Sequence, residues 1–243
     1  MLRLIFVVLF LLVFFLLSLI IQFILWIVGK FNPMAQKTIS LAIVSRAFKV
    51  VAFLSGVKLT VIGEENVPKD TPVLYVGNHR SYFDIVLSYA RVPRITGYIA
   101  KKEIKKVPIL STWMKYMDCL FLDRDDIRQG LQVILTAIDH VKNGISITIY
   151  PEGTRNSTDE MLPFHKGSFK IAQKTGCPIV PMTINNSNAI FEDHAPFIKK
   201  THVILEYGKP IYMDQLSPED KKNIENYCYN IIKETYEKNK VDE

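Results

Sequence analysis

An uncharged apolar run near the start of the chain constrains its fold more than any other feature. Residues 4–28 read LIFVVLFLLVFFLLSLIIQFILWIV and contain no charged side chain. As a helix this run would be about 37 Å long, whereas the hydrocarbon core of a bilayer is about 30 Å thick. It is also longer than the apolar region of a cleaved secretion signal, which has about 7–15 residues. We therefore interpret it as an uncleaved membrane anchor.

A second apolar stretch, residues 35–55, has one narrow polar side. At about 100° per residue, four of its polar and basic side chains fall within a single arc of about 100°; they are Thr38, Ser45, Arg46 and Lys49. This pattern is typical of a helix that lies in the membrane interface with its basic side towards the lipid headgroups. A helix packed in the core of the following domain is the alternative.

Basic residues follow the first apolar run and hardly precede it. Only Arg3 and the amino terminus come before it, whereas Lys30, Lys37 and two further basic residues follow. Because positive loops tend to stay inside the cell, we expect the bulk of the chain on the cytoplasmic face, of the inner membrane if the cell is bacterial. A hairpin that turns at Asn32-Pro33 and enters one leaflet would leave the same side in the cytoplasm, so spanning and single-leaflet insertion both remain open.

Charge divides the chain into two parts. Residues 1–56 hold five Lys and Arg and no Asp or Glu, while the remaining 187 residues hold 25 basic and 24 acidic side chains. A nearly neutral domain argues against nucleic acid as a partner, since a nucleic-acid-binding domain carries the excess charge itself. Three widely spaced cysteines exclude a disulfide scaffold. We predict a membrane anchor over residues 1–56 and a catalytic domain over 57–243.

Short β-rich runs alternate with helical segments from residue 57 onward. The predicted strands are residues 58–62, 73–76, 119–122, 145–150, 179–184 and 203–207. The predicted helices are residues 82–90, 109–116, 127–141, 167–174 and 218–238, the last with Ser217 as its N-cap. The alternation predicts an α/β fold in which a mostly parallel sheet is flanked by helices and preceded by an N-terminal membrane-associated helix pair.

The sequence NHRSYFD, residues 78–84, follows the second predicted strand. Ser81 suits a helix N-cap, which would hold His79 in the turn and place Asp84 in the first helical turn. From there the carboxylate can bind one imidazole nitrogen and leave the other free to accept a proton. Such a pair suits the activation of a substrate hydroxyl, although the same residues can also serve only as a turn and a helix cap.

Three further segments also carry candidate functional groups. The turn YPEGTR, residues 150–155, offers backbone N–H groups and the guanidinium of Arg155, both suited to phosphate oxygens, and Glu152 can orient that arginine or bond a ligand hydroxyl. Arg124 follows another predicted strand. An ordinary polar turn and a surface ion pair are the alternatives at these positions. Two prolines in the strand CPIVPM, residues 177–182, predict an edge strand or a close approach to ligand.

A basic segment, residues 91–106, contains six Lys and Arg residues and one Glu. Lys101 and Lys105 are four residues apart, so a helix would present both on one side. There they can attract an anionic headgroup, the phosphates of a donor or an acidic carrier protein. A solvated charged surface is the alternative.

Together, NHRSYFD, FLDR, YPEGTR and PIVP resemble in order and spacing the glycerolipid acyltransferase family, specifically its 1-acyl-sn-glycerol-3-phosphate acyltransferases. The resemblance covers about residues 57–210. It implies an O-acyltransferase of phospholipid biosynthesis that moves an acyl chain from a thioester to the sn-2 hydroxyl of lysophosphatidate, giving phosphatidate. By the same resemblance His79 is the general base, Asp84 orients it, and the acceptor's glycerol phosphate is bound by Glu152, Gly153, Thr154 and Arg155 with help from Arg124.

We expect the donor to be acyl-CoA or acyl-carrier protein. A thioester is already activated, so we expect no metal, no cofactor and no enzyme nucleophile, and we interpret the three cysteines as buried and inert. Relatives with other acceptors share the histidine motif, which leaves glycerol 3-phosphate or another lysolipid as an alternative acceptor. A metal-dependent phosphatase with His79, Asp84 and Glu152 as ligands, and a non-enzymatic binder of anionic lipid, are the alternatives from other classes.

Overall fold

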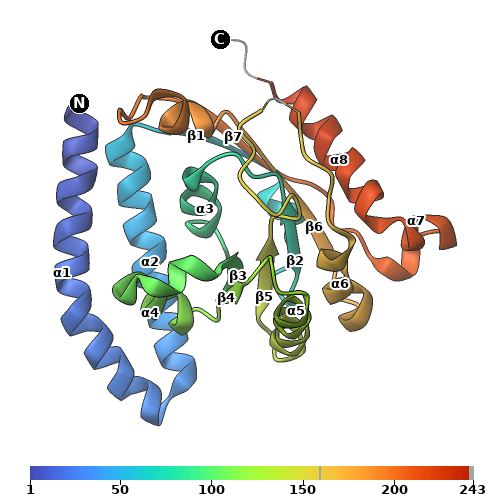
Figure 1. Ribbon diagram of the computed structural model, residues 1–243, viewed down its shortest axis with the longest axis horizontal. Helices are drawn as coiled ribbons and strands as arrows, with labels where there is room; N and C mark the ends of the chain where they lie inside the picture. The colour runs from blue at the N-terminus through green and yellow to red at the C-terminus, as the bar shows by residue number, and fades with distance from the viewer. Residues whose placement is uncertain (159, 241–243) are drawn as a thin grey trace.

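The computed structural model describes residues 1–158 and 160–240 and contains a seven-stranded sheet of order β1-β7-β6-β2-β5-β3-β4 (Figure 1). Neighbouring strands are parallel except β6 and β7, which are antiparallel. The predicted α/β class with a mostly parallel sheet is therefore confirmed. The strands are β1 (Lys58–Ile62), β2 (Leu74–Gly77), β3 (Thr96–Lys101), β4 (Leu120–Leu122), β5 (Ser146–Ile149), β6 (Ile179–Asn185) and β7 (His202–Tyr207).

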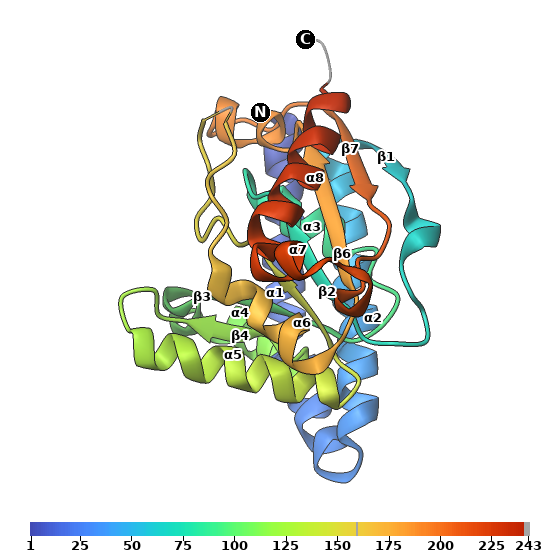
Figure 2. The same ribbon diagram turned by 90° about the vertical axis from the view of Figure 1, so that its right-hand side faces the viewer.

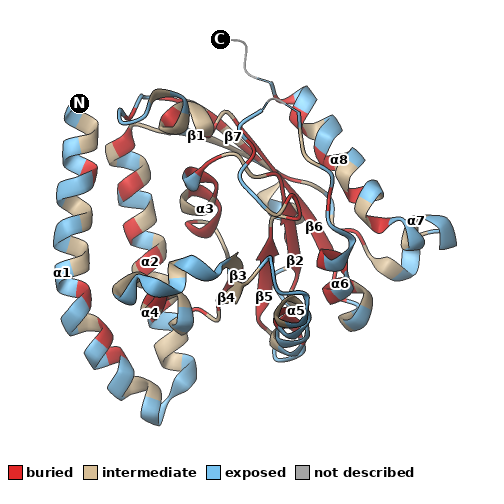
Figure 3. Cartoon of the chain, viewed as in Figure 1, coloured by how far each residue is buried: buried red, intermediate tan, exposed pale blue. Residues whose placement is uncertain are grey.

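Helices cover both faces of this sheet (Figures 1 and 2). Alternate residues of β2 show why: Leu74 and Val76 pack with residues of α5, α6 and α8, whereas Tyr75 packs with residues of α1, α2 and α3. Both faces of the central strands are buried for this reason (Figure 3). The helices are α1 (Leu2–Phe31), α2 (Pro33–Ser55), α3 (Tyr82–Tyr89), α4 (Pro108–Tyr116), α5 (Ile127–Lys142), α6 (Lys170–Thr175), α7 (Pro218–Lys222) and α8 (Ile224–Lys238).

The N-terminal helices form an antiparallel hairpin that turns at Asn32-Pro33 (Figure 1). The Asn32 side chain accepts a hydrogen bond from the N–H of Ala35 and so caps α2. Polar contacts join α1 to α4: the Trp113 indole N–H donates to the hydroxyl of Ser18 at 2.9 Å, and the Gln22 amide donates to the carbonyl of Ile109 at 2.8 Å.

Exposed large apolar residues occur along α1 from Leu2 to Phe31, and Figure 3 shows exposed residues along the whole length of this helix. Both hairpin helices are long and apolar enough to cross a membrane, with mean hydropathies of 3.5 for α1 and 1.6 for α2. The helix pair is therefore consistent with membrane association.

Helix α2 has one side packed against the rest of the protein and one side exposed, so it combines the two alternatives, core packing and the membrane interface. Val44 and Val51 are buried, and the Ser45 hydroxyl donates to the carbonyl of Tyr89 at the end of α3. Arg46 and Lys49 are exposed. The prediction that Ser45 shares the headgroup side with the basic residues is therefore wrong, because this serine faces α3.

Two predicted elements differ from the observed ones, and one observed strand was not predicted. Strand β3 was not predicted, because its glycine and terminal lysine weaken the strand pattern; a Cβ on Gly97 would lie 2.3 Å from the carbonyl oxygen of Asp118. The predicted C-terminal helix is divided at Asn223 into α7 and α8, although Ser217 does cap it as predicted. The predicted helix 167–174 begins as a 3-10 turn, Lys166–Phe169, before α6.

The proline-containing strand β6 is an interior strand, so the edge-strand alternative is wrong. Pro181 pairs with Val76 of β2 on one side. On the other side, pairing with β7 begins only at Met182, opposite Tyr207. Pro181 therefore lies at an interruption of this antiparallel pairing, which resumes at the bridge between Ile179 and Ile211.

Candidate active site

The candidate site lies where β2 and β5 end. These neighbouring parallel strands are in register with Val76 opposite Ile149. The chain therefore delivers the turns that contain His79 and Glu152 to the same edge of the sheet, where open α/β folds commonly bind ligands.

His79 and Asp84 form the predicted pair. Ser81 is the N-cap of α3 and accepts a hydrogen bond from the N–H of Phe83 at 2.9 Å. Asp84 lies in the first turn, and its Oδ2 is 2.8 Å from Nδ1 of His79. A carboxylate accepts hydrogen bonds only, so Nδ1 carries the hydrogen and Nε2 is left to accept a proton.

The carboxylate of Asp84 is completely buried and has further partners. Its Oδ2 accepts the backbone N–H groups of Arg80 at 2.7 Å and Ser81 at 2.8 Å, while its Oδ1 accepts the hydroxyl of Ser187. These donors stabilise the ionised carboxylate and hold it in one orientation. Ser187 follows β6 and was not predicted.

The backbone and ring of His79 are also held. Its N–H donates to Oε1 of Glu152, and its carbonyl accepts the N–H of Asn156, both at 2.8 Å. The imidazole stacks on the ring of Tyr150, with 4.2 Å between centroids and 15° between planes. Only 13% of the His79 side chain is exposed. The imidazole is thus held against Tyr150 on one face and remains partly exposed.

Glu152 is buried behind this turn, with 4% exposed. While Oε1 accepts the N–H of His79, Oε2 accepts the N–H of Leu162 at 3.0 Å. Burial raises the pKa of Glu152 above its ordinary value. Both carboxylate oxygens accept hydrogen bonds from the protein itself. Glu152 thus positions the turn that contains His79, a role that the sequence did not reveal.

Arg155 lies beside the start of α3. Its guanidinium packs 3.6 Å from the ring centroid of Tyr82, and Nη2 donates to the Tyr82 hydroxyl at 3.0 Å. Its Nη1 is 3.5 Å from Oε1 of Glu192. The Arg155 side chain is 37% exposed, so it is oriented by its neighbours yet open to a ligand.

Glu192 is a site residue that the sequence analysis missed. Its carboxylate accepts the Ser81 hydroxyl at 2.7 Å and the N–H of Tyr82 at 2.8 Å. It therefore links the N-terminus of α3 to Arg155. No local pattern predicts this contact, because Glu192 lies in a short 3-10 turn more than 100 residues along the chain.

The turn between Glu152 and Arg155 requires a glycine. Gly153 has φ +74°, and a Cβ there would lie 3.1 Å from the His165 ring. Thr154 is exposed next to it. A side chain at Gly153 is therefore disfavoured both by the backbone conformation and by the neighbouring imidazole.

The remaining predicted binding residues lie at or after the carboxyl ends of β3 and β4. Lys101 is the last residue of β3, and Lys105 lies in a 3-10 turn, so the prediction that they share one side of a helix is wrong. Arg124 follows β4, and all three side chains are exposed. An ion pair of 2.6 Å between Lys102 and Asp123 joins these two segments.

Two other expectations concern cysteine and metal. Cys119, Cys177 and Cys228 are free and buried, as predicted. Burial raises the pKa of Cys119 and of Cys228 to about 12, which keeps both thiols protonated and unreactive. Within residues 1–158 and 160–240, no group of three or more His, Cys, Asp or Glu is placed to hold a metal ion.

At the ends of these parallel strands, a histidine oriented by a buried carboxylate is a general base suited to the activation of a substrate hydroxyl. Residues 58–185 match the Acyltransferase family, and the chain belongs to that family.

Among curated proteins, the chain is similar to a 1-acyl-sn-glycerol-3-phosphate acyltransferase of Borreliella burgdorferi, at 31% identity over 76% of this chain and 74% of the relative. A protein of the same name from Saccharomyces cerevisiae is 32% identical over 70% of this chain and 57% of its own length. Among solved structures, the fold is similar to that of the 1-acyl-sn-glycerophosphate acyltransferase PlsC from Thermotoga maritima. That match has a TM-score of 0.73 and 22% identity, over 93% of this chain and 99% of the other.

Proposed function

We propose that this chain transfers an acyl group from an acyl thioester to the sn-2 hydroxyl of 1-acylglycerol 3-phosphate, giving phosphatidate for phospholipid biosynthesis. The observation that carries this proposal is the His79–Asp84 pair, in which the carboxylate holds Nδ1, so that Nε2 of a partly exposed side chain is left to accept a proton. The curated relatives bear the name of this activity.

In the proposed reaction His79 acts as general base. Its Nε2 removes the proton from the sn-2 hydroxyl while the oxygen attacks the thioester carbonyl carbon. The resulting tetrahedral species re-forms its carbonyl by breaking the carbon–sulfur bond, and the imidazolium returns the proton to the departing sulfur. The products are phosphatidate and a free thiol on the donor. Asp84 stabilises the imidazolium that forms between these steps.

Arg155 is the residue we assign to the phosphate of the acceptor. The phosphate and the reacting hydroxyl of lysophosphatidate are on adjacent carbons of glycerol, so a phosphate site must lie close to the base. Arg155 meets this condition, since its neighbour Asn156 donates to the carbonyl of His79. We place Gly153 and Thr154 in the same phosphate-binding turn, with Glu152 as its buried support. Lys101, Lys105 and Arg124 are proposed as outer contacts for the headgroup or the donor.

We also propose that residues 1–56 anchor the enzyme to the membrane and that residues 57–243, the acyltransferase catalytic domain, work on its cytoplasmic face. The exposed apolar side of α1 and the exposed Arg46 and Lys49 of α2 support membrane attachment. The acyl donor is acyl-CoA or acyl-carrier protein. Protease protection in sealed membrane vesicles of known orientation tests the proposed side: cleavage of the catalytic domain from the non-cytoplasmic side would contradict it.

Turnover by purified full-length enzyme tests the function. Lysophosphatidate, glycerol 3-phosphate and a neutral-headgroup lysophospholipid are each offered with acyl-CoA and with acyl-carrier protein. We expect phosphatidate formation with lysophosphatidate at the highest kcat/KM, and the better donor identifies itself in the same experiment. Higher kcat/KM with another acceptor would reassign the enzyme within the family. Phosphate release that stops on addition of a chelator would favour a metal-dependent phosphatase instead.

A further inference from the structure

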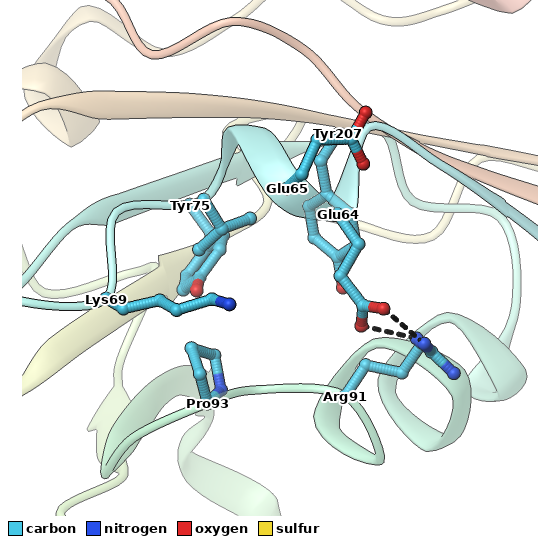
Figure 4. Close-up of a pocket in the computed structure, with 8 residues that line it drawn as sticks. Glu64, Glu65, Lys69, Tyr75, Arg91, Pro93 and Tyr207 are labelled. Atoms are coloured by element: carbon cyan, nitrogen blue, oxygen red, sulfur yellow. Dashed lines mark hydrogen bonds and ion pairs between the residues drawn. The ribbon is translucent and has the colours of Figure 1, made fainter.

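A cavity of about 350 Å³ lies at the opposite end of α3 from His79 (Figure 4). Its walls come from the 3-10 turn after β1, from β2 and β7, and from the segment that follows α3. Residues of the candidate active site do not line it. The volume lies within the range of about 300–1,000 Å³ found for small-molecule sites.

Two buried tyrosines direct their hydroxyls into this cavity. Tyr75 is 2% exposed and Tyr207 is 3% exposed, and Figure 4 shows both side chains reaching towards the space beside Lys69 and Glu64. Neither hydroxyl has a hydrogen-bond partner in the part of the chain that the structure describes. The rings belong to the buried core, whereas the hydroxyl oxygens are not among the buried atoms that lack a partner, so they reach the accessible space of the cavity. The two hydroxyls are therefore available to a polar occupant of the cavity.

The charges around the cavity favour an anion. The ammonium group of Lys69 extends into the open space (Figure 4). Glu64 is neutralised by Arg91, which donates to both of its oxygens through Nε and Nη2, and the Glu65 carboxylate points away from Lys69 and Tyr75 in Figure 4. The cavity thus presents an ammonium group and two hydroxyls, with its one inward carboxylate already paired.

Arg94 adds positive charge next to the same wall. Its Nη1 is buried without a hydrogen-bond partner among residues 1–158 and 160–240. The guanidinium lowers the pKa of Tyr75, but burial outweighs it and raises that pKa overall. The Tyr75 hydroxyl therefore keeps its hydrogen at physiological pH and remains a donor.

We propose that this cavity binds a phosphate monoester at a site separate from the acceptor site. Lys69, Tyr75 and Tyr207 supply donors from different directions, which suits a tetrahedral oxyanion with several acceptor oxygens. The cavity has room for a small polyol attached to the phosphate. The ligand is either the headgroup of an anionic lipid such as phosphatidate or a soluble phosphate ester. A bound ligand would contact three parts of the chain: the turn after β1, strand β7 and the end of α3.

Binding of glycerol 3-phosphate to full-length enzyme in neutral detergent tests the proposal. The Arg155→Ala variant removes the main phosphate ligand of the acceptor site, so calorimetric titration of this variant reports the cavity. We expect one remaining site there. Adding Lys69→Gln should weaken it about tenfold or more, because a charged hydrogen bond is lost. Tyr75→Phe should weaken it less, and Lys174→Gln, an exposed lysine on α6, should leave it unchanged.

Competition identifies the source of the ligand. Phosphatidate added to the micelles displaces glycerol 3-phosphate from the Arg155→Ala protein if the site takes a lipid headgroup, and it does not if the site takes a soluble ester. No binding in the Arg155→Ala variant, or binding indifferent to both Lys69→Gln and Tyr75→Phe, would overturn the proposal. A markedly lower Tm for Tyr75→Phe without ligand would also contradict it, since the hydroxyl would then have a structural partner. None of these measurements uses turnover. Failure of the proposed cavity site can therefore be distinguished from failure of the acyltransferase assignment.

Discussion

The centre and the rim of the candidate site are built differently. At the centre, Asp84 and Glu152 are buried, and each of their carboxylate oxygens accepts hydrogen bonds from the protein itself. At the rim, Lys101, Lys105 and Arg124 are exposed side chains on strand ends and turns. The fold therefore preorganises the groups that carry the chemistry, whereas the rim keeps donors that a mobile, charged substrate can use. Variants at the centre should impair kcat or folding, and variants at the rim should impair only binding.

The largest effect is expected at Asp84. The Asp84 carboxylate accepts several hydrogen bonds, and in Asp84→Asn the NH2 group of the amide would face some of the same donors. The variant also loses the charge that stabilises the imidazolium. We expect kcat to fall about 10²–10⁴-fold, with KM for the acceptor changed much less. Steady-state turnover measures both. Asp139→Asn, an exposed carboxylate on α5, is the matched control. A fall in kcat of less than tenfold would place Asp84 outside the chemistry.

Glu152→Ala separates support of the turn from catalysis. It leaves the N–H groups of His79 and Leu162 without their acceptor, and two unpaired buried donors of this kind destabilise by about 2–6 kcal/mol in total. Chemical denaturation should show this loss. Because burial raises the pKa of Glu152, the folded protein holds that proton more tightly than the unfolded chain. The unfolding free energy of wild type relative to Glu152→Gln should therefore decrease as the pH rises above the ordinary glutamate value of about 4.3. An increase over that range would contradict the assigned pKa shift.

Arg155 should show the effect of a binding residue placed next to the centre. Arg155→Ala removes charge-assisted hydrogen bonds to the acceptor phosphate, and we expect KM for lysophosphatidate to rise about 10–100-fold. Arg155→Lys should restore part of this, since a lysine keeps the charge but lacks the planar fork. Glu192→Gln tests the support of Arg155 and should give a smaller rise in KM. An unchanged KM in Arg155→Ala would remove this residue from the phosphate site.

The smallest effects are expected at the rim. Single replacements of Lys101, Lys105 or Arg124 by alanine should raise KM for the donor or the acceptor by at most about fivefold, because exposed charges interact weakly in water. The effect should shrink as ionic strength rises and the charges are screened. Turnover at low and high salt tests this. A loss of kcat comparable to that of Asp84→Asn would erase the difference between centre and rim.

Local sequence patterns were sufficient for the catalytic pair and insufficient for its surroundings. His79, Ser81 and Asp84 lie within one turn and one helix start, so capping preferences and spacing predict their contact. Ser187 and Glu192 reach the same place from the segment after β6, the strand that lies on the other side of β2 from β5. Their positions depend on the strand order, which no pattern in the sequence specifies.

The same distinction explains the errors in the fold. Strand β3 was missed because it contains Gly97, yet that glycine is required where the backbone of Asp118 passes close to the strand. An edge position, one of the two expectations for β6, was wrong because Pro181 is accommodated at an interruption of the pairing within an interior strand. The parallel sheet and most of the predicted strands and helices followed from alternation and periodicity, which are properties of short segments.

Turnover by His79→Ala tests the central claim most directly. The variant removes the imidazole, while Asp84 keeps its contacts to the N–H groups of Arg80 and Ser81 and to Ser187. The account predicts that phosphatidate formation falls by at least about 10²-fold, while Tm, membrane attachment and the Kd for lysophosphatidate stay close to those of wild type. Acyl transfer at near wild-type rates by a folded His79→Ala enzyme would contradict it.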